Sequence, residues 1–123
     1  MKQAAYRDAI TAYQGLYLPD VGGTWVVSER ERLRQNYITA SLELAKIDLD
    51  AAEFHDALET TDRLITEDPC LEEAYRIAMR IHAAAGNRAA IAYQYQNLCQ
   101  ALYSEIGAQP SPQTEALYNS LMG

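Results

Sequence analysis

The residue types that most often do chemistry are sparse in this sequence, and their spacing is not that of a catalytic or metal site. His55 and His82 lie far apart along the chain, and neither has a second ligand at metal-binding spacing. Glu72 and Glu73 are adjacent carboxylates, but they fall at a predicted helix start, where acidic groups interact favourably with the helix dipole. We therefore interpret the histidines as surface or packing residues and predict neither catalytic residues nor a metal site.

Sequence motifs of the large enzyme classes are absent as well. The chain has no G-x-S-x-G, no G-x-x-x-x-G-K-[ST] and no H-E-x-x-H. Gly22-Gly23 lacks the following Lys that would hold a phosphate, so we predict a turn there. Cys70 and Cys99 do not have C-x-x-C spacing and are interpreted as reduced packing residues. These observations predict a protein that is not an enzyme and needs no cofactor.

The composition is that of one folded, acidic domain. The 123 residues are 49% hydrophobic and 22% charged, with a net charge of -7. An acidic chain is unsuited to gripping nucleic acid or an anionic membrane by itself, because phosphate binding needs clustered Lys and Arg. No apolar run approaches the ~18 residues of a membrane span, and the N-terminus lacks a signal-peptide core. We expect a cytoplasmic protein without a membrane partner.

Helical periodicity runs through almost the whole chain and predicts an all-α fold of about six helices. A first helix is predicted over Gln3–Gln14, before the break GLYLPDVGGT. A long helix then begins at Thr24 or at Ser28, where Ser28 and Glu31 have capping-box spacing. Its apolar residues step by four and three, which places them on one face: Leu33, Tyr37, Ala40, Leu44 and Ile47.

The later helices are bounded by capping residues. Asp68 is predicted to cap a helix with Pro69 at its first position, after Pro69 has ended the preceding helix. Gly86-Asn87 is predicted to form the next turn, and a helix marked by Ile91, Tyr95, Leu98, Leu102 and Ile106 follows. Ser111 and Pro112 begin a last helix that runs through Leu121.

Two of these turns, at Ala52 and Gly86, are separated by the period of the tetratricopeptide repeat, a helix-turn-helix unit of about 34 residues. The resemblance implies a right-handed array of antiparallel helix hairpins, with repeats over 38–71 and 72–105 and flanking helices completing the stack. The positions that would define the repeat are Ala52, Phe54, Ala57, Pro69, Gly86 and Tyr95.

The order of motifs along the chain is more specific than the repeat. YQGLYLPD, then ERERLR, then DALETTDRLITEDP, then EIGAQPSPQTEALYNSL follow one another. Together they resemble the bacterial transcriptional activator domain of antibiotic-regulatory-protein-type regulators and of larger signalling ATPases. The tail is similar to the family's Leu-Gly-x-x-Pro-Ser-x-x-Thr ending, with Ile106 in place of the usual Leu. The insert Gly22-Gly23 departs from the pattern.

The resemblance implies a single regulatory and oligomerisation domain over 1–123, as part of a longer regulator in which an upstream domain reads DNA. Its expected partners are further copies of itself, other domains of the same regulator and RNA polymerase. The alternative is a tetratricopeptide adaptor, or the same module within a signalling ATPase, with no tie to DNA binding.

The repeat geometry predicts a protein-binding groove lined by the first helix of each unit. Lys46 and Arg80 fall at the same repeat position, and with Arg76 they would offer a basic patch to an acidic peptide or carboxylate. The alternative is that these three side chains pair with glutamates along their own helices. The predicted groove residues are Lys46, Asp50, Glu73, Arg76 and Arg80.

Nine tyrosines stand against one phenylalanine. Tyr75, Tyr93, Tyr95 and Tyr103 fall in predicted helices, where a ring can pack while its hydroxyl reaches solvent. We interpret them as core edges and helix–helix contacts, and the alternative is a partner interface, where tyrosine is enriched.

Overall fold

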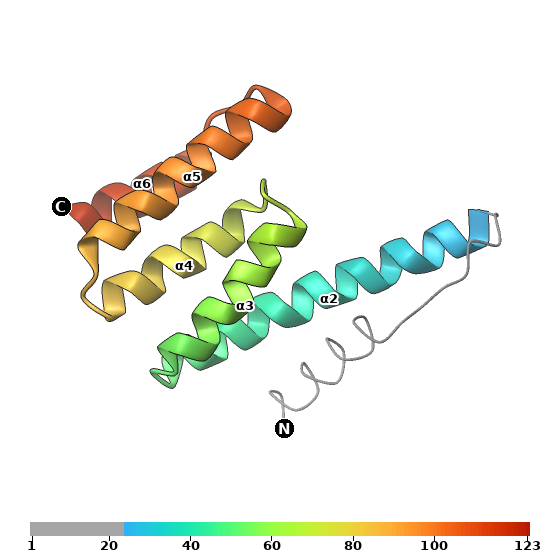
Figure 1. Ribbon diagram of the computed structural model, residues 1–123, viewed down its shortest axis with the longest axis horizontal. Helices are drawn as coiled ribbons and strands as arrows, with labels where there is room; N and C mark the ends of the chain where they lie inside the picture. The colour runs from blue at the N-terminus through green and yellow to red at the C-terminus, as the bar shows by residue number, and fades with distance from the viewer. Residues whose placement is uncertain (1–23) are drawn as a thin grey trace.

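The computed structural model describes residues 24–123, and the predicted helix Gln3–Gln14 and the Gly22-Gly23 turn lie outside this range. The described part is all helical, without a strand, which confirms the predicted all-α class. Its five helices are α2 (Thr24–Asp50), α3 (Phe54–Glu67), α4 (Glu72–Ala84), α5 (Arg88–Ile106) and α6 (Pro112–Met122) (Figure 1). None of these helices is long and apolar enough to cross a membrane.

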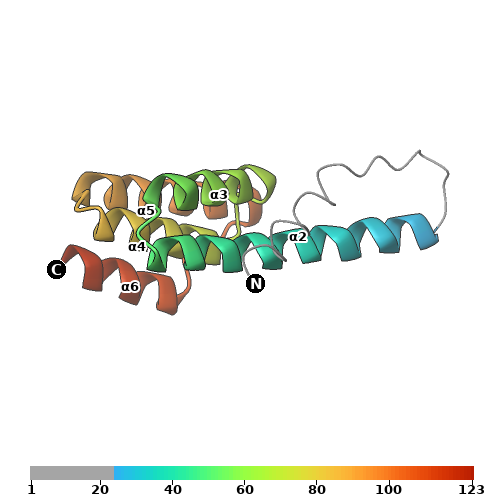
Figure 2. The same ribbon diagram turned by 90° about the horizontal axis from the view of Figure 1, so that it is seen from below.

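The helices form a tetratricopeptide-like array of antiparallel pairs. α2 pairs with α3 and α4 pairs with α5, while α3 also contacts α4. α4 lies between α2 and α6 and contacts both of them, and α3 and α5 lie on the other side (Figure 2). The first helices of successive hairpins therefore form one layer and the second helices form the other.

The turns after α2 and α4 have the same backbone geometry. Ala52 and Gly86 both have a positive φ, 60° and 75°, which lets the chain reverse after a helix. The Ala52 amide donates to the Leu49 carbonyl, and the Glu53 amide donates to the Asp48 carbonyl. The same two bonds recur at the equivalent positions of the turn between α4 and α5. This identity supports the division into repeats over 38–71 and 72–105, which stays a prediction.

The core lies between the hairpins, where small and branched side chains let the helices approach. Ala57 and Leu64 of α3 are fully buried against α2 and α4, and Phe54 packs on the edge of that cluster. A smaller cluster joins α4 to α5 through Tyr75, Leu98 and Leu102. Burying each such large side chain contributes roughly 1.5–3 kcal/mol.

Several predicted apolar faces are confirmed, with one exception. Tyr37, Ala40 and Leu44 of α2 are buried, and so is Ile91 of α5. Ile106 was predicted on the face of α5 that also carries Leu102, but its side chain is 65% exposed. It is the last helical residue, before Gly107 turns the chain away in the left-handed conformation.

One of the two alternatives for the start of the long helix was wrong, and so was the predicted start at Pro69. α2 already runs through Ser28, so the capping-box alternative fails and the start at Thr24 holds. α4 begins at Glu72 rather than at Pro69. The Asp68 carboxylate caps no helix, because it accepts a hydrogen bond from the Cys70 amide within the turn, at 3.1 Å. The cap at Ser111 is confirmed, since its side chain accepts from the Thr114 amide.

Candidate functional site

The predicted groove residues lie on two neighbouring helices of one layer. Lys46 and Asp50 belong to α2, and Glu73, Arg76 and Arg80 belong to α4. α2 and α4 contact each other directly. The structure therefore brings the predicted residues to one region, and their individual contacts differ.

Lys46 is held by two carboxylates. Its Nζ lies 2.9 Å from Glu73 Oε1 on α4 and 3.3 Å from Glu43 Oε1 on its own helix. The hydrogen bond with Glu73 is the main reason that the pKa of Lys46 is raised. The predicted pairing along the helix is thus present, together with a cross-helix pair that sequence spacing did not suggest. The Lys46 charge is consequently balanced within the protein.

Arg76 binds α6 through a buried threonine. Its Nη1 donates to Thr114 Oγ1 at 2.9 Å, and Thr114 is fully buried. The Thr114 hydroxyl in turn donates to Glu72 Oε1 at 2.8 Å. The Ser111 amide donates to the same carboxylate oxygen at 2.9 Å. These contacts hold the first turn of α6 against the first turn of α4.

The charge of Glu72 is favoured by this arrangement. Burial raises the pKa of its carboxyl, but the hydrogen bonds from Ser111 and Thr114 and the nearby Arg76 outweigh burial and leave the pKa lowered. Sequence reasoning placed Glu72 only at a helix start. Its role in binding Ser111 and Thr114 of the Pro-Ser-x-x-Thr motif depends on contacts between segments far apart in the sequence.

Arg80 is the basic groove residue whose charge is least engaged. Its side chain is exposed, and the part of the chain that the structure describes supplies no ion pair to it. Asp50, at the end of α2, is exposed as well. Of the predicted basic patch, Arg80 thus offers the charge most accessible to a partner.

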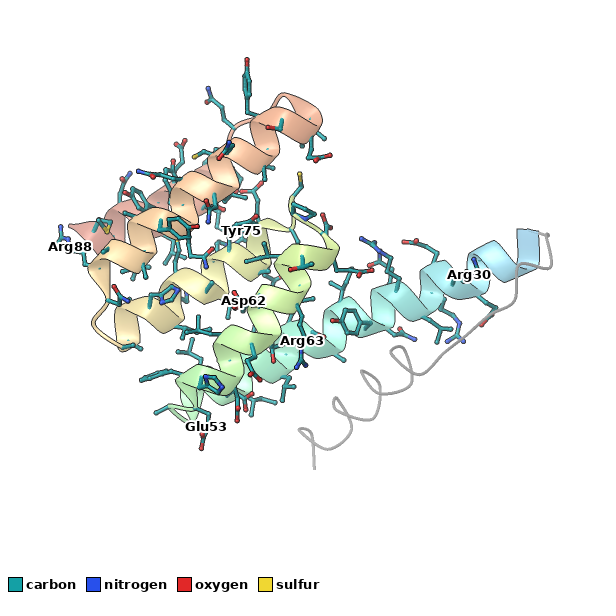
Figure 3. All side chains as sticks on the ribbon, in the orientation of Figure 1. Arg30, Glu53, Asp62, Arg63, Tyr75 and Arg88 are labelled. Carbon is teal, nitrogen blue, oxygen red and sulfur yellow. The ribbon has the colours of Figure 1, made fainter. Side chains whose placement is uncertain are left out.

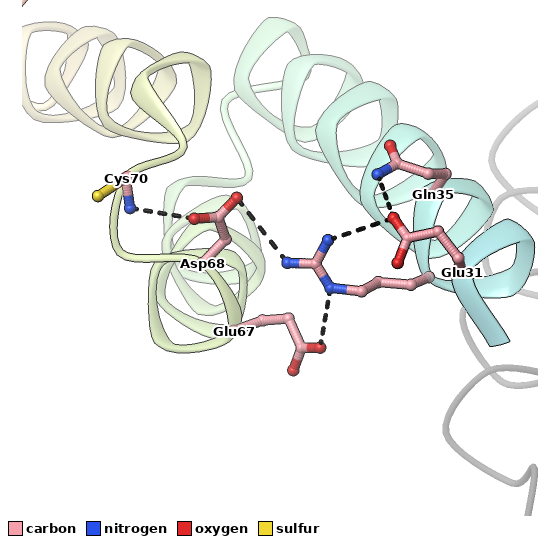
Figure 4. A network of polar contacts seen from close by, with 6 residues as sticks. Glu31, Gln35, Glu67, Asp68 and Cys70 are labelled. Atoms are coloured by element: carbon pink, nitrogen blue, oxygen red, sulfur yellow. Dashed lines mark hydrogen bonds and ion pairs between the residues drawn. The ribbon is translucent and has the colours of Figure 1, made fainter. Parts of the chain in front are cut away.

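A second charged cluster joins α2 to the end of α3. Arg34 lies 3.7 Å from Glu67 and 3.9 Å from both Asp68 and Glu31 (Figure 4). Gln35 donates to Glu31 on the same helix, at 3.0 Å. A guanidinium near the last turn of α3 also interacts favourably with the carbonyl end of that helix. This cluster links α2 to the end of α3 at the protein surface.

The histidines and cysteines have separate surroundings. His55 lies 3.2 Å from Glu59 on the exposed face of α3. Burial lowers the pKa of His82, which faces Asp62, and burial raises the pKa of Asp62. The Cys70 thiol points at the Ala101 carbonyl, 3.8 Å away. Within residues 24–123, no three His, Cys, Asp or Glu side chains come together as metal ligands.

The tyrosines divide into two groups. Tyr75 of α4, labelled in Figure 3, is buried. Its hydroxyl donates to the Pro69 carbonyl at 2.9 Å. Tyr95 stacks on Tyr118 of α6, with ring centroids 3.9 Å apart. Tyr93 and Tyr103 are 65% and 78% exposed, so their interpretation as packing residues was wrong. The alternative, a partner interface, remains for these two.

Comparison with known families gives one identification. Comparisons with curated proteins and with solved structures give no match. The bacterial transcriptional activator domain matches residues 2–122, which is almost the whole chain. The matched range includes all five described helices and the contacts by which Ser111 and Thr114 bind Glu72 of α4. The chain belongs to the bacterial transcriptional activator domain family, a family of transcription-regulator domains.

Proposed function

We propose that this chain is the oligomerisation and protein-interaction domain of a bacterial transcriptional activator. In this proposal a separate domain of the activator recognises the target DNA. The observation that carries the proposal is the family match over residues 2–122. The layered helical array supports it, because such arrays present extended helix faces to other proteins.

The charge of the chain supports the division of labour. Seventeen Asp and Glu outnumber ten Lys and Arg. Several of the basic side chains are already engaged, since Arg32, Arg34 and Lys46 form ion pairs with glutamates. A surface of this kind provides few of the phosphate contacts on which DNA affinity depends. The partners we propose are further copies of the domain, other domains of the regulator and RNA polymerase.

A selection from random double-stranded DNA tests this division. The isolated chain should enrich no sequence at low ionic strength, where phosphate contacts are strongest. The positive control is the complete regulator, with the separate DNA-reading domain that we propose, and it should enrich a defined site under the same conditions. Enrichment of a consensus by the isolated chain would show that this domain reads DNA and would overturn the proposal.

A further inference from the structure

α5 carries an exposed stripe without charge. Ala89, Tyr93, Gln96, Gln100 and Tyr103 follow one another at spacings of four and three, and all five are exposed. We call this set the α5 stripe. No residue from Ala89 to Ser104 is charged, in a chain that is 22% charged. Spacings of three and four are those of residues that meet a partner helix in a coiled coil.

The exposed apolar surface is concentrated on the same helix. Among residues whose side chains are described, the exposed large hydrophobics are Tyr93, Tyr103 and Ile106, and all three belong to α5. Tyrosine is over-represented at protein interfaces, where its ring supplies contact area at a small loss of side-chain freedom. The outer face of α5 is therefore the best interface surface on the described part of the domain.

The stripe is self-complementary when two copies of α5 run antiparallel. Tyr93 and Tyr103 lie five residues to either side of position 98, and Gln96 and Gln100 lie two residues to either side. A two-fold axis that crosses the stripe at the height of residue 98 along α5 places Tyr93 of one copy opposite Tyr103 of the other. The same axis places Gln96 opposite Gln100, where the two amides can donate to and accept from each other.

The lack of charge on the stripe favours pairing of two copies over this face. Two copies that each carry a net charge of -7 meet with least repulsion where neither presents a charged side chain.

We propose that the domain self-associates as a two-fold dimer through antiparallel packing of the α5 stripe against the α5 stripe of a second copy. This assignment rests on the proposed function and names the surface for one of its partners. The dimer should be weak, because one pair of helices buries an area at the low end of specific interfaces. A dissociation constant in the micromolar range or weaker is expected.

Sedimentation velocity of the whole chain over a range of concentrations tests the surface. Wild type should show a concentration-dependent rise toward the dimer, and the double variant Tyr93→Glu/Tyr103→Glu should weaken association at least tenfold. The matched control is His55→Glu/Thr66→Glu, which adds acidic groups on the exposed face of α3 and should associate like wild type. Circular dichroism of each variant confirms folding. A wild-type monomer at all concentrations, or equal association of the Tyr93→Glu/Tyr103→Glu variant, overturns the proposal.

Cysteine cross-linking tests the direction of the pairing. The single variants Tyr93→Cys and Tyr103→Cys are made in a chain with Cys70→Ser and Cys99→Ser, and one of them carries a mass tag. Three samples are oxidised: each variant alone, and an equal mixture of the two. Only the mixture should form a disulfide dimer, because in each separate sample the new cysteines lie roughly 15 Å apart along the axis. Cross-linking of either variant alone, or none in the mixture, overturns antiparallel pairing. Association that survives in the Tyr93→Glu/Tyr103→Glu variant leaves the proposed function standing and removes only this surface.

Discussion

Ala52 and Gly86, at equivalent positions of the turns that follow α2 and α4, adopt the same left-handed backbone conformation, with φ of 60° and 75°. Glycine tolerates this region, whereas alanine is strained there by its Cβ. The same turn is thus built once with a favoured residue and once with a disfavoured one. Ala52 therefore carries backbone strain that Gly86 lacks.

Exchanging these residues should shift stability in opposite directions. Ala52→Gly should raise the free energy of unfolding by roughly 0.5–1 kcal/mol, since relief of strain exceeds the added freedom of the unfolded chain. Gly86→Ala should lower it by about as much. A Cβ at Gly86 would meet no atom within 4 Å, so strain alone is measured. Urea denaturation provides the values, and shifts of the same sign in both variants would contradict the common turn geometry.

Thr114→Val should loosen α6 from α4. Valine has nearly the shape of threonine but neither donates to Glu72 nor accepts from Arg76. The loss should be about 1–3 kcal/mol, because partly buried polar groups are left without their partner. Thr66→Val is the control, since Thr66 is exposed and bonds only its own helix, and it should change stability by less than about 0.5 kcal/mol. Equal effects in urea denaturation would show that the network contributes nothing.

The same network predicts a pH dependence. The pKa of Glu72 is lowered from 4.5 in the folded chain, so its contribution is fully present above pH 4.5 and is lost as pH falls through the lowered pKa. The stability difference between wild type and Glu72→Gln should therefore be largest near neutral pH and shrink below 4.5. The raised pKa of Asp62 makes the folded chain gain stability as the pH falls, but this effect is the same in wild type and in Glu72→Gln and cancels in their difference. A difference that is constant across this range would argue against a stabilising Glu72 charge.

Arg80→Glu tests the groove with little risk to folding. Arg80 is exposed, so the free energy of unfolding should change by less than about 0.5 kcal/mol. Binding of a labelled Glu-rich peptide at low ionic strength should weaken several-fold in fluorescence anisotropy. Arg63→Glu, on exposed α3 in the other layer, is the charge-matched control. If both variants bind alike, the basic groove is not the recognition site.

Local features of the fold could be predicted from the sequence where one residue type decides the backbone. Gly86 and Ser111 marked a turn and a helix start, because positive φ and side-chain capping leave strong signals. Asp68 misled, since the same carboxylate serves equally well in a turn, where it accepts from Cys70.

Contacts between distant segments were beyond sequence reasoning. Glu72 accepts from Ser111 and Thr114 only because α6 returns to the start of α4, and no spacing along the chain records that return. The stacking of Tyr95 on Tyr118 likewise depends on where α6 lies. The exposure of Tyr93 and Tyr103 could have been predicted, because helical spacing places both off the face that carries Ile91, Leu98 and Leu102.

A repressor-fusion assay in cells tests the central claim, that copies of this domain associate. The chain is fused behind a repressor DNA-binding domain that lacks its own dimerisation module, with a reporter under the paired operator. The account predicts repression by the wild-type fusion above that of the unfused DNA-binding domain, and its loss with Tyr93→Glu/Tyr103→Glu, at equal protein levels. Repression no stronger than that of the unfused DNA-binding domain would contradict self-association by this domain.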